Sequence, residues 1–302
     1  MNQQNKKFKE KLKNLPKTPG IYLMKDSHQD VLYVGKAKNL KQRVSSYFQN
    51  NSQHSNKVRR MVFNLADFEI IEVDTELDAL LLECELIQQH HPLYNRQMNQ
   101  FAQYCYINID EQGITSSTLD GELGPYRAYR KIPEIIRQLS ELYQLSTINH
   151  ITKLSLEKQL PEMKHYPLPE KSNEIRGFFE GRDDSYHYWM NQRIAYCIEE
   201  RYFEHAQKLS EELQFLTTFY NQIRELHHFI NQKENQFILP ISASEKKVYQ
   251  LAYGKVVYSK IIPYTETFQP ISLTPNQTAL GKSEIDPTLI LLHYIKKMSE
   301  KG

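Results

Sequence analysis

Residues 75–95, TELDALLLECELIQQHHPLYN, decide the fold of the first part of this chain, because they predict one helix with clear start and stop signals. Thr75 is a favourable N-cap, and Asp78 follows it at the spacing of a capping box. Pro92 disfavours helical backbone at the residue before it, so we expect the helix to end near His90.

Glu83 is the unusual residue of this helix, because it falls on an arc otherwise made of alanine, leucine and isoleucine. A carboxylate in apolar surroundings is costly unless something uses its charge. Two interpretations remain open on the residues alone. Glu83 is a functional carboxylate, or it lies partly exposed on a second polar stripe with Glu76 and His90.

Length and composition indicate a globular protein without a membrane span. The chain has 302 residues and 40% hydrophobic residues, which is typical of a globular protein with two or three domains. No apolar run reaches the roughly 18 residues of a membrane span, and the basic N-terminus lacks the apolar segment of a secretory signal. An odd number of cysteines without metal-ligand spacing favours neither a disulfide framework nor a metal centre (Cys84, Cys105, Cys197). We therefore expect a cytoplasmic protein.

Charge is distributed unevenly although the formal net charge is only +2. Residues 1–60 contain 14 Lys and Arg but 3 Asp and Glu, whereas residues 61–95 contain 8 Asp and Glu and no Lys or Arg. A basic surface next to carboxylates suits a phosphate ligand together with a cation. The alternative is an ordinary charge bias that keeps the protein in solution.

The segments before the helix predicted at residues 75–90 predict a small sheet covered by helices. Residues 20–24 (GIYLM) and 31–35 (VLYVG) predict a hairpin, and Asn39 caps the helix that follows. A further helix at 57–65 and a strand at 68–73 complete a β-β-α-α-β-α order. Four side chains of this unit are candidates to converge on one site: Tyr22, Tyr33, Lys36 and Arg43.

These motifs resemble the GIY-YIG nuclease family, in its UvrC/Cho branch. The resemblance rests on Gly20-Ile21-Tyr22, Tyr33-Val34-Gly35-Lys36, Asn39-Leu40-x-x-Arg43 and Glu83…Asn95, in the family's order and spacing. It implies a hydrolase that cuts DNA with a single divalent ion, Mg²⁺ or Mn²⁺. No motif residue of the nuclease is missing.

The resemblance also implies a role for each residue. Glu83 is the metal ligand, Arg43 holds the scissile phosphate, and Tyr22 and Tyr33 frame the attacking water. One tyrosine is the general base, and we favour Tyr33 because it stands beside Lys36. The remaining assignments are a structural or phosphate-contacting amide for Asn95, a water-orienting hydroxyl for Tyr47, and phosphate contacts for Asn39, Lys38 and Lys41.

The fold class expected for the whole chain is α+β. A GIY-YIG domain with a three-stranded antiparallel sheet precedes a mostly helical region with a hairpin, and a small C-terminal β element follows. The expected divisions are 1–98, 99–172, 173–235 and 236–302, with 146–172 a linker or extended crossover and a last helix from about Pro287. No cysteine lies between Cys105 and Cys197, so an iron–sulfur cluster is not expected.

Residues 201–209 resemble the second half of the UVR helical hairpin, through which UvrC-type proteins contact UvrB. The resemblance implies a partner-binding role for Phe203, Glu204, Ala206 and Leu209. The same spacing suits the core face of any amphipathic helix, so a purely structural hairpin is the alternative.

The function expected from the resemblance is incision of double-stranded DNA on the 3′ side of a lesion, in nucleotide excision repair and the SOS response, with UvrB as partner and no membrane. Two rivals remain. One is a nuclease that acts on DNA structure, or in defence, without UvrB. The other is a non-catalytic module that binds repair proteins.

Overall fold

The computed structural model describes residues 3–49, 55–95, 104–128, 130–272 and 280–300. The chain divides into two compact units: residues 1–100, 233–278 and 283–302 form unit 1, and residues 101–232 with 279–282 form unit 2. The expected division between residues 98 and 99 lies outside the described residues. Within those ranges no helix combines the length and hydropathy that crossing a bilayer requires.

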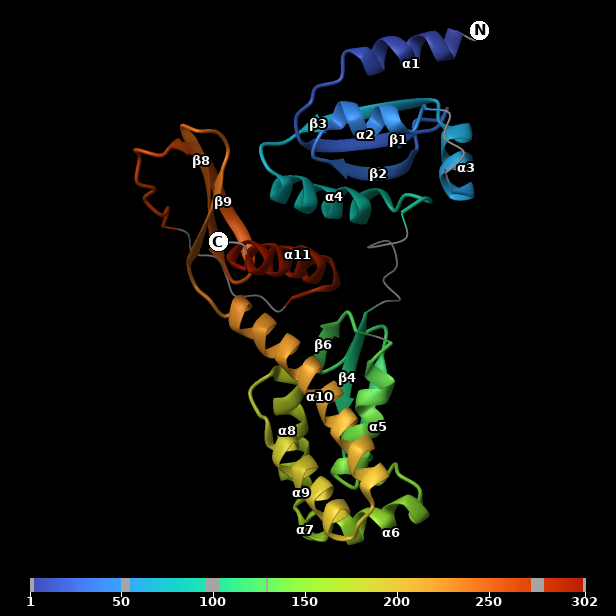
Figure 1. Ribbon diagram of the computed structural model, residues 1–302, viewed down its shortest axis with the longest axis vertical. Helices are drawn as coiled ribbons and strands as arrows, with labels where there is room; N and C mark the ends of the chain where they lie inside the picture. Colours follow the sequence, from blue (N-terminus) through green and yellow to red (C-terminus); the bar gives the residue numbers. More distant parts are fainter. Residues whose placement is uncertain (1–2, 50–54, 96–103, 129, 273–279, 301–302) are drawn as a thin grey trace. The chain divides into compact units, whose positions relative to one another are not determined.

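The N-terminal part of unit 1 is a three-stranded antiparallel sheet in the order β2-β1-β3, with helices on both faces (Figure 1). The strands are β1 (Gly20–Lys25), β2 (Val31–Ala37) and β3 (Asp67–Glu72), and the helices are α1 (Gln3–Lys13), α2 (Leu40–Ser46), α3 (Asn56–Asn64) and α4 (Glu76–His90). The expected sheet and helix order is confirmed. Thr75 and Asp78 form the reciprocal capping box, and the left-handed residue His91 ends α4.

The central strand β1 is buried on both faces, because each face has its own hydrophobic cluster. Tyr22 and Met24 pack with residues of α1, α2 and α3, whereas Ile21 and Leu23 pack against Ala79 and other residues of α4. The alternation of side chains along β1 therefore sends Tyr22 to the face covered by α2 and leaves α4 on the other.

The C-terminal part of unit 1 is a second antiparallel sheet, in the order β7-β8-β9, with one helix. Its elements are β7 (Asn235–Pro240), β8 (Glu245–Ala252), β9 (Lys255–Pro263) and α11 (Lys282–Ser299). The expected strands are confirmed. The last helix starts earlier than expected, because Pro287 lies within its first turns instead of at its start.

Unit 2 contains a three-stranded sheet in the order β5-β4-β6, and six helices within its described residues. The elements are β4 (Cys105–Ile109), β5 (Ile114–Ser117), β6 (Leu123–Tyr126), α5 (Ile132–Leu142), α6 (His150–Gln159), α7 (Glu162–His165), α8 (Leu168–Glu180), α9 (Ser185–Glu199) and α10 (Phe203–Ile230). The expected hairpin is α9–α10. No sequence pattern over residues 104–126 predicts this sheet.

The expectation of a linker over 146–172 is wrong, because α6, α7 and the start of α8 occupy it. Its prolines do not interrupt helices. Pro161 and Pro167 are the N-cap residues of α7 and α8, and Pro169 lies in the first turn of α8. The missing proline N–H has no helical acceptor in a first turn, so proline is tolerated there.

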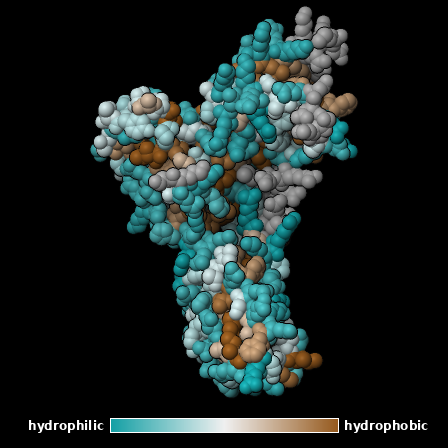
Figure 2. Space-filling view, viewed as in Figure 1, coloured by the Kyte–Doolittle hydropathy of each residue, from teal (hydrophilic) through white to brown (hydrophobic). Residues whose placement is uncertain are grey.

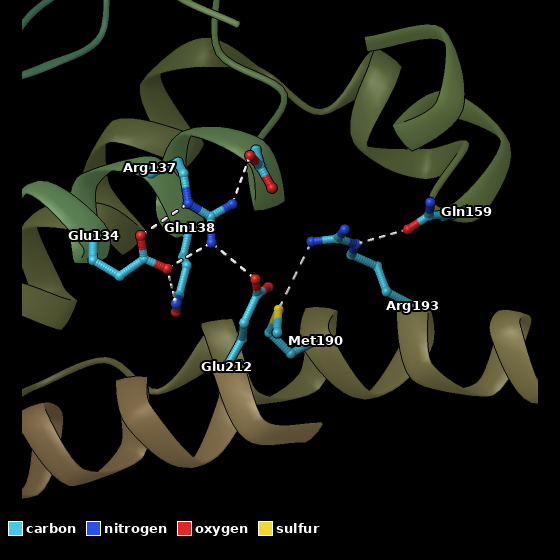
Figure 3. A network of polar contacts seen from close by, with 8 residues as sticks. Glu134, Arg137, Gln138, Gln159, Met190, Arg193 and Glu212 are labelled. Atoms are coloured by element: carbon cyan, nitrogen blue, oxygen red, sulfur yellow. Dashed lines mark hydrogen bonds and ion pairs between the residues drawn. The ribbon is translucent and has the colours of Figure 1, made fainter. Parts of the chain in front are cut away.

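Two groups of polar contacts, around Arg137 and around Arg193, link helices of unit 2 (Figure 3). The Arg137 guanidinium donates hydrogen bonds to carboxylates of Glu134, Glu141 and Glu212 at 2.6–3.0 Å. Arg193 is 3% exposed, and its Nε donates to Gln159 Oε1 at 3.1 Å. Arg137 is therefore paired within α5 and with α10 through Glu212, and Arg193 links α9 to α6.

Candidate active site

A glycine brings two tyrosines together on the α2 face of the sheet. Tyr22 of β1 pairs with Gly35 of β2, and Tyr33 lies two residues before Gly35 on the same face. A Cβ atom on Gly35 would lie 2.4 Å from the Tyr22 hydroxyl and 2.7 Å from the Tyr33 ring. Only glycine therefore fits, and the two ring centroids lie 6.0 Å apart.

The helix α2 adds an arginine and a third tyrosine to this pair. Asn39 Oδ1 accepts the Gln42 N–H at 2.9 Å and caps the helix. Arg43 Nε, one turn into the helix, donates to the Tyr22 hydroxyl at 3.3 Å. The Tyr47 hydroxyl lies 2.8 Å from that of Tyr22, and the Arg43 guanidinium lies 5.3 Å from the centre of the Tyr47 ring.

Tyr22 and Tyr33 differ in burial, and their pKa values differ as a result. Burial raises the pKa of Tyr22 far above its ordinary value, and Tyr47 and Tyr33 raise it further. Burial also raises the pKa of Tyr33, to about 12, with added contributions from Tyr47 and the Glu83 charge. Because Tyr22 is fully buried and Tyr33 is partly exposed, Tyr33 is the easier phenol to deprotonate.

The free edge of strand β2 is covered by groups from α4 and from the loop that follows it. Asn95 Oδ1 accepts the Val34 N–H at 2.9 Å, and Asn95 Nδ2 donates to the Val34 carbonyl at 2.8 Å. Two residues along the same edge, the Lys36 N–H donates to Glu83 Oε1 at 3.2 Å. Asn95 therefore fixes backbone geometry, which is one of the two roles expected for it.

Glu83 is half-buried, and burial raises the pKa of its carboxyl group. The charge and backbone N–H of Lys36 lower that pKa, and so does the charge of Arg43. The charges of Glu83 and Arg43 both act on the pKa of Tyr33, so the three groups lie within electrostatic range of one another. By contrast, Glu76 forms an ion pair with Lys38, and His90 is exposed. Glu83 therefore does not belong to a plain solvated stripe.

The residues expected to contact phosphate lie around the start of α2. Lys38 is exposed and pairs with Glu76 at 2.9 Å, and the Lys41 ammonium donates to the Lys13 carbonyl at 2.7 Å. The Asn39 side chain acts as a helix cap. Their phosphate contacts remain predictions, because each has an intramolecular partner that DNA would have to supplement or replace.

The residues expected to bind a partner separate into two pairs. Ala206 and Leu209 of α10 are 6% and 1% exposed and belong to the hydrophobic core of unit 2, which corrects their assignment as contact residues. Phe203 is 63% exposed, and Glu204 is exposed beside it. Apolar atoms are visible on the surface of this end of unit 2 (Figure 2), where Phe203, Tyr202, Ile151 and Leu154 line one cavity.

Two residues that sequence analysis missed hold the start of α4. The Tyr249 hydroxyl lies 2.5 Å from Thr75 Oγ1 and donates to Asp78 Oδ1 at 3.0 Å. The Lys247 ammonium donates to Asp74 and Asp78 at 2.7 and 2.9 Å. Strand β8 therefore contacts the N-terminus of the helix that carries Glu83. No local sequence pattern marks a contact between residues 174 positions apart.

The comparison with known proteins agrees with this site. Residues 18–96 match the model of the UvrC-like GIY-YIG domain. UvrABC system protein C of Caldanaerobacter subterraneus subsp. tengcongensis is 34% identical over 261 residues, which are 81% of this chain and 42% of that protein. The same protein of Clostridium tetani is 44% identical over 147 residues, which are 46% of this chain and 24% of the relative. The chain thus spans less than half of each relative.

Among solved structures, the N-terminal endonuclease domain of UvrC from Thermotoga maritima, described as bound to its catalytic divalent cation, magnesium, is 34% identical in sequence. The match covers 32% of this chain and 99% of that domain, with a TM-score of 0.28.

The motif residues and the match to the family model define residues 18–96 as a GIY-YIG endonuclease domain, a class of DNA-cleaving hydrolase. Within that class the domain belongs to the UvrC-like family, as the sequence motifs indicated.

Proposed function

We propose that this chain is a metal-dependent DNA endonuclease of nucleotide excision repair. It hydrolyses one phosphodiester on the 3′ side of a lesion, in DNA that UvrB presents. The observation that supports this best is the contact geometry around Tyr22 and strand β2. Arg43 donates to the Tyr22 hydroxyl, and the Tyr22 ring lies 6.0 Å from that of Tyr33. Glu83 accepts the N–H of Lys36, which follows Tyr33 on the same strand. Among the described residues neither Arg43 nor Glu83 forms an ion pair, so both are available to a phosphate and a cation.

The donor set fits a hard divalent cation held mainly by water. The Lys36 N–H fixes one Glu83 oxygen, and no further hydrogen bond to this carboxylate occurs within the described part of the chain. No cluster of three or more His, Cys, Asp or Glu occurs there either. One carboxylate, waters and a phosphate oxygen are a ligand set that Mg²⁺ accepts. When bound, the ion supplies positive charge to the phosphate and to the leaving oxygen.

The side chains of the chain itself supply the remaining chemistry. Arg43 binds the scissile phosphate and stabilises the charge that builds on it in the transition state. The Tyr33 hydroxyl accepts the proton of the attacking water, which requires its phenolate, and the charge of Arg43 favours that form because it lowers the pKa of Tyr33. Tyr22, hydrogen-bonded to Tyr47 and Arg43, keeps the guanidinium in place. Exposed Phe203 and Glu204 are available to UvrB.

The test is nicking of a lesion-bearing duplex in the presence of UvrA, UvrB and Mg²⁺. Glu83→Gln should reduce the rate by at least about a thousandfold, because it removes the anionic ligand and keeps the shape. Glu85→Gln, an exposed position on the same helix, is the matched control and should cut normally. Normal cutting by Glu83→Gln contradicts the metal assignment, and equal cutting without UvrB supports the rival nuclease that acts without it.

A further inference from the structure

The outward face of α3 carries an exposed aromatic ring between two arginines. Phe63 is 88% exposed, and Arg59 and Arg60 are exposed on the same helix. The arginines precede Phe63 by four and three positions, so the three side chains share one face. Met61, which is 2% exposed, holds the opposite face in the core. The orientation of α3 is therefore fixed by its buried side, and Phe63 cannot turn inward.

The chemistry of this face favours a nucleic acid. An isolated exposed apolar residue is common and needs no explanation. Here, however, α3 has no acidic residue, and neither arginine forms an ion pair among the described residues. Guanidinium groups without an ion-pair partner bind phosphates of a nucleic acid backbone, and an exposed aromatic ring stacks on a base that has lost its neighbour. The combination of both groups on one face therefore fits a nucleic acid.

The position of α3 connects this face to the catalytic cluster. Met61 packs in the same hydrophobic cluster as Tyr22 and Tyr47, so α3 lies on the α2 face of the sheet. At its C-terminal end, Asn64 Nδ2 donates to the Tyr94 hydroxyl at 3.2 Å, and Asn95, the next residue, is bound to β2. A helix of this length covers about 13 Å, comparable to the rise of about four base pairs. Arg43 and α3 therefore lie on the same side of the sheet, as one DNA segment that contacts both would require.

We propose that α3 is a second DNA contact, in which Arg59 and Arg60 bind phosphates and Phe63 stacks on a base that has lost a neighbour. These three residues, Arg59, Arg60 and Phe63, make up the α3 face. The inference rests on the proposed function for its substrate class. If Phe63 stacks in this way, the domain binds DNA with an unstacked base near the scissile phosphate more tightly than it binds an intact duplex.

The experiment measures binding of the full chain without cleavage. In a Glu83→Gln background, dissociation constants are measured by fluorescence anisotropy for an intact duplex and for one with a bulged fluorescent adenine analogue. Phe63→Ala should weaken binding to the bulged duplex about tenfold, should change binding to the intact duplex less than about twofold, and should abolish quenching of the analogue. Phe63→Trp should retain both binding and quenching, because it keeps a stacking ring.

Two further sets of variants separate the parts of the α3 face. Arg59→Gln and Arg60→Gln should weaken binding to both duplexes alike, each with a reduction of about one in the slope of binding against salt. Leu119→Ala, an 81% exposed apolar position in unit 2, is the control and should change nothing.

The outcomes distinguish this inference from the proposed function. Unchanged binding and quenching in Phe63→Ala overturns the stacking contact while leaving the nuclease assignment intact. An effect of Phe63→Ala only in complexes that contain UvrB overturns it in favour of a protein contact. If the Glu83→Gln parent binds neither duplex at any salt concentration, the proposed function fails first.

Discussion

The charges around Arg43 and those around Arg137 are held in opposite ways. Arg137 of unit 2 has three carboxylate partners (Figure 3), whereas Arg43 of unit 1 contacts a tyrosine hydroxyl and the face of a tyrosine ring. Glu83 likewise accepts a backbone N–H instead of an ammonium group. The charge of Arg137 is neutralised by carboxylates of the chain, whereas Arg43 and Glu83 are oriented by neutral groups, as the proposed binding of a phosphate and a cation requires.

The largest effect should follow from changing a charge that neutral groups orient. Arg43→Lys should slow nicking by about a hundredfold or more. A lysine ammonium group cannot bind a phosphate through two parallel hydrogen bonds, as the guanidinium of arginine can. The melting temperature of the variant should stay close to that of the parent, since no ion pair is lost. Single-turnover cleavage and calorimetry measure the two quantities. If Arg43→Lys instead lowered the melting temperature and left the nicking rate unchanged, Arg43 would serve stability as Arg137 does, and the contrast between the two arginines would be wrong.

The next effect is the pH dependence of cleavage. Burial raises the pKa of Tyr33 to about 12, so the phenol is protonated at neutral pH and loses its proton as pH rises. If Tyr33 is the base, the single-turnover rate should rise about tenfold per pH unit between roughly pH 7 and pH 9. Tyr33→Phe should abolish both the activity and this slope. A flat profile in the parent would assign the proton transfer to another group.

A smaller effect should follow from breaking the neutralised network of unit 2. Arg137→Met leaves the carboxylates of Glu134, Glu141 and Glu212 without their common partner, which should lower the free energy of unfolding by about 1–3 kcal/mol. We expect the nicking rate per folded molecule to remain unchanged. Adding Glu212→Gln should restore part of the stability, because it removes one of the unpaired charges. Denaturant unfolding curves test both changes.

The smallest effect should come from the contact that joins β8 to the start of α4. Tyr249→Phe removes hydrogen bonds to Thr75 and Asp78 and should cost about 1 kcal/mol of stability. Because α4 keeps its own capping box, affinity for Mg²⁺ should fall only a few-fold. Isothermal titration with Mg²⁺ checks this, with Tyr264→Phe as the exposed control. Complete loss of Mg²⁺ binding would make β8 part of the site itself.

Local signals made the first domain predictable. The capping box, the residues between Thr75 and His90, and the three strands all follow from patterns within a few residues of one another. The site residues required the family resemblance, because periodicity places Tyr22 and Tyr33 on strands without showing that they face each other across Gly35. Burial of the Glu83 carboxyl group is a property of the assembled sheet edge.

The rest of the chain depended on contacts that leave no local signal. The prolines near α7 and α8 indicated a linker, yet they begin helices, and a sequence alone does not show on which side of a helix boundary a proline falls. Phe203 was grouped with Ala206 and Leu209 by helical spacing, although it lies at the first position of α10 and is exposed. The contacts of Lys247 and Tyr249 with α4 join distant segments.

The covered edge of β2 has a consequence for how the domain tolerates change. An unpaired strand edge is a template on which a second chain can add a strand. Here the Asn95 amide and the Glu83 carboxylate occupy that edge. Alanine at either position would remove these partners and uncover backbone of β2, which should favour strand addition and aggregation, whereas glutamine at position 83 keeps an acceptor for the Lys36 N–H.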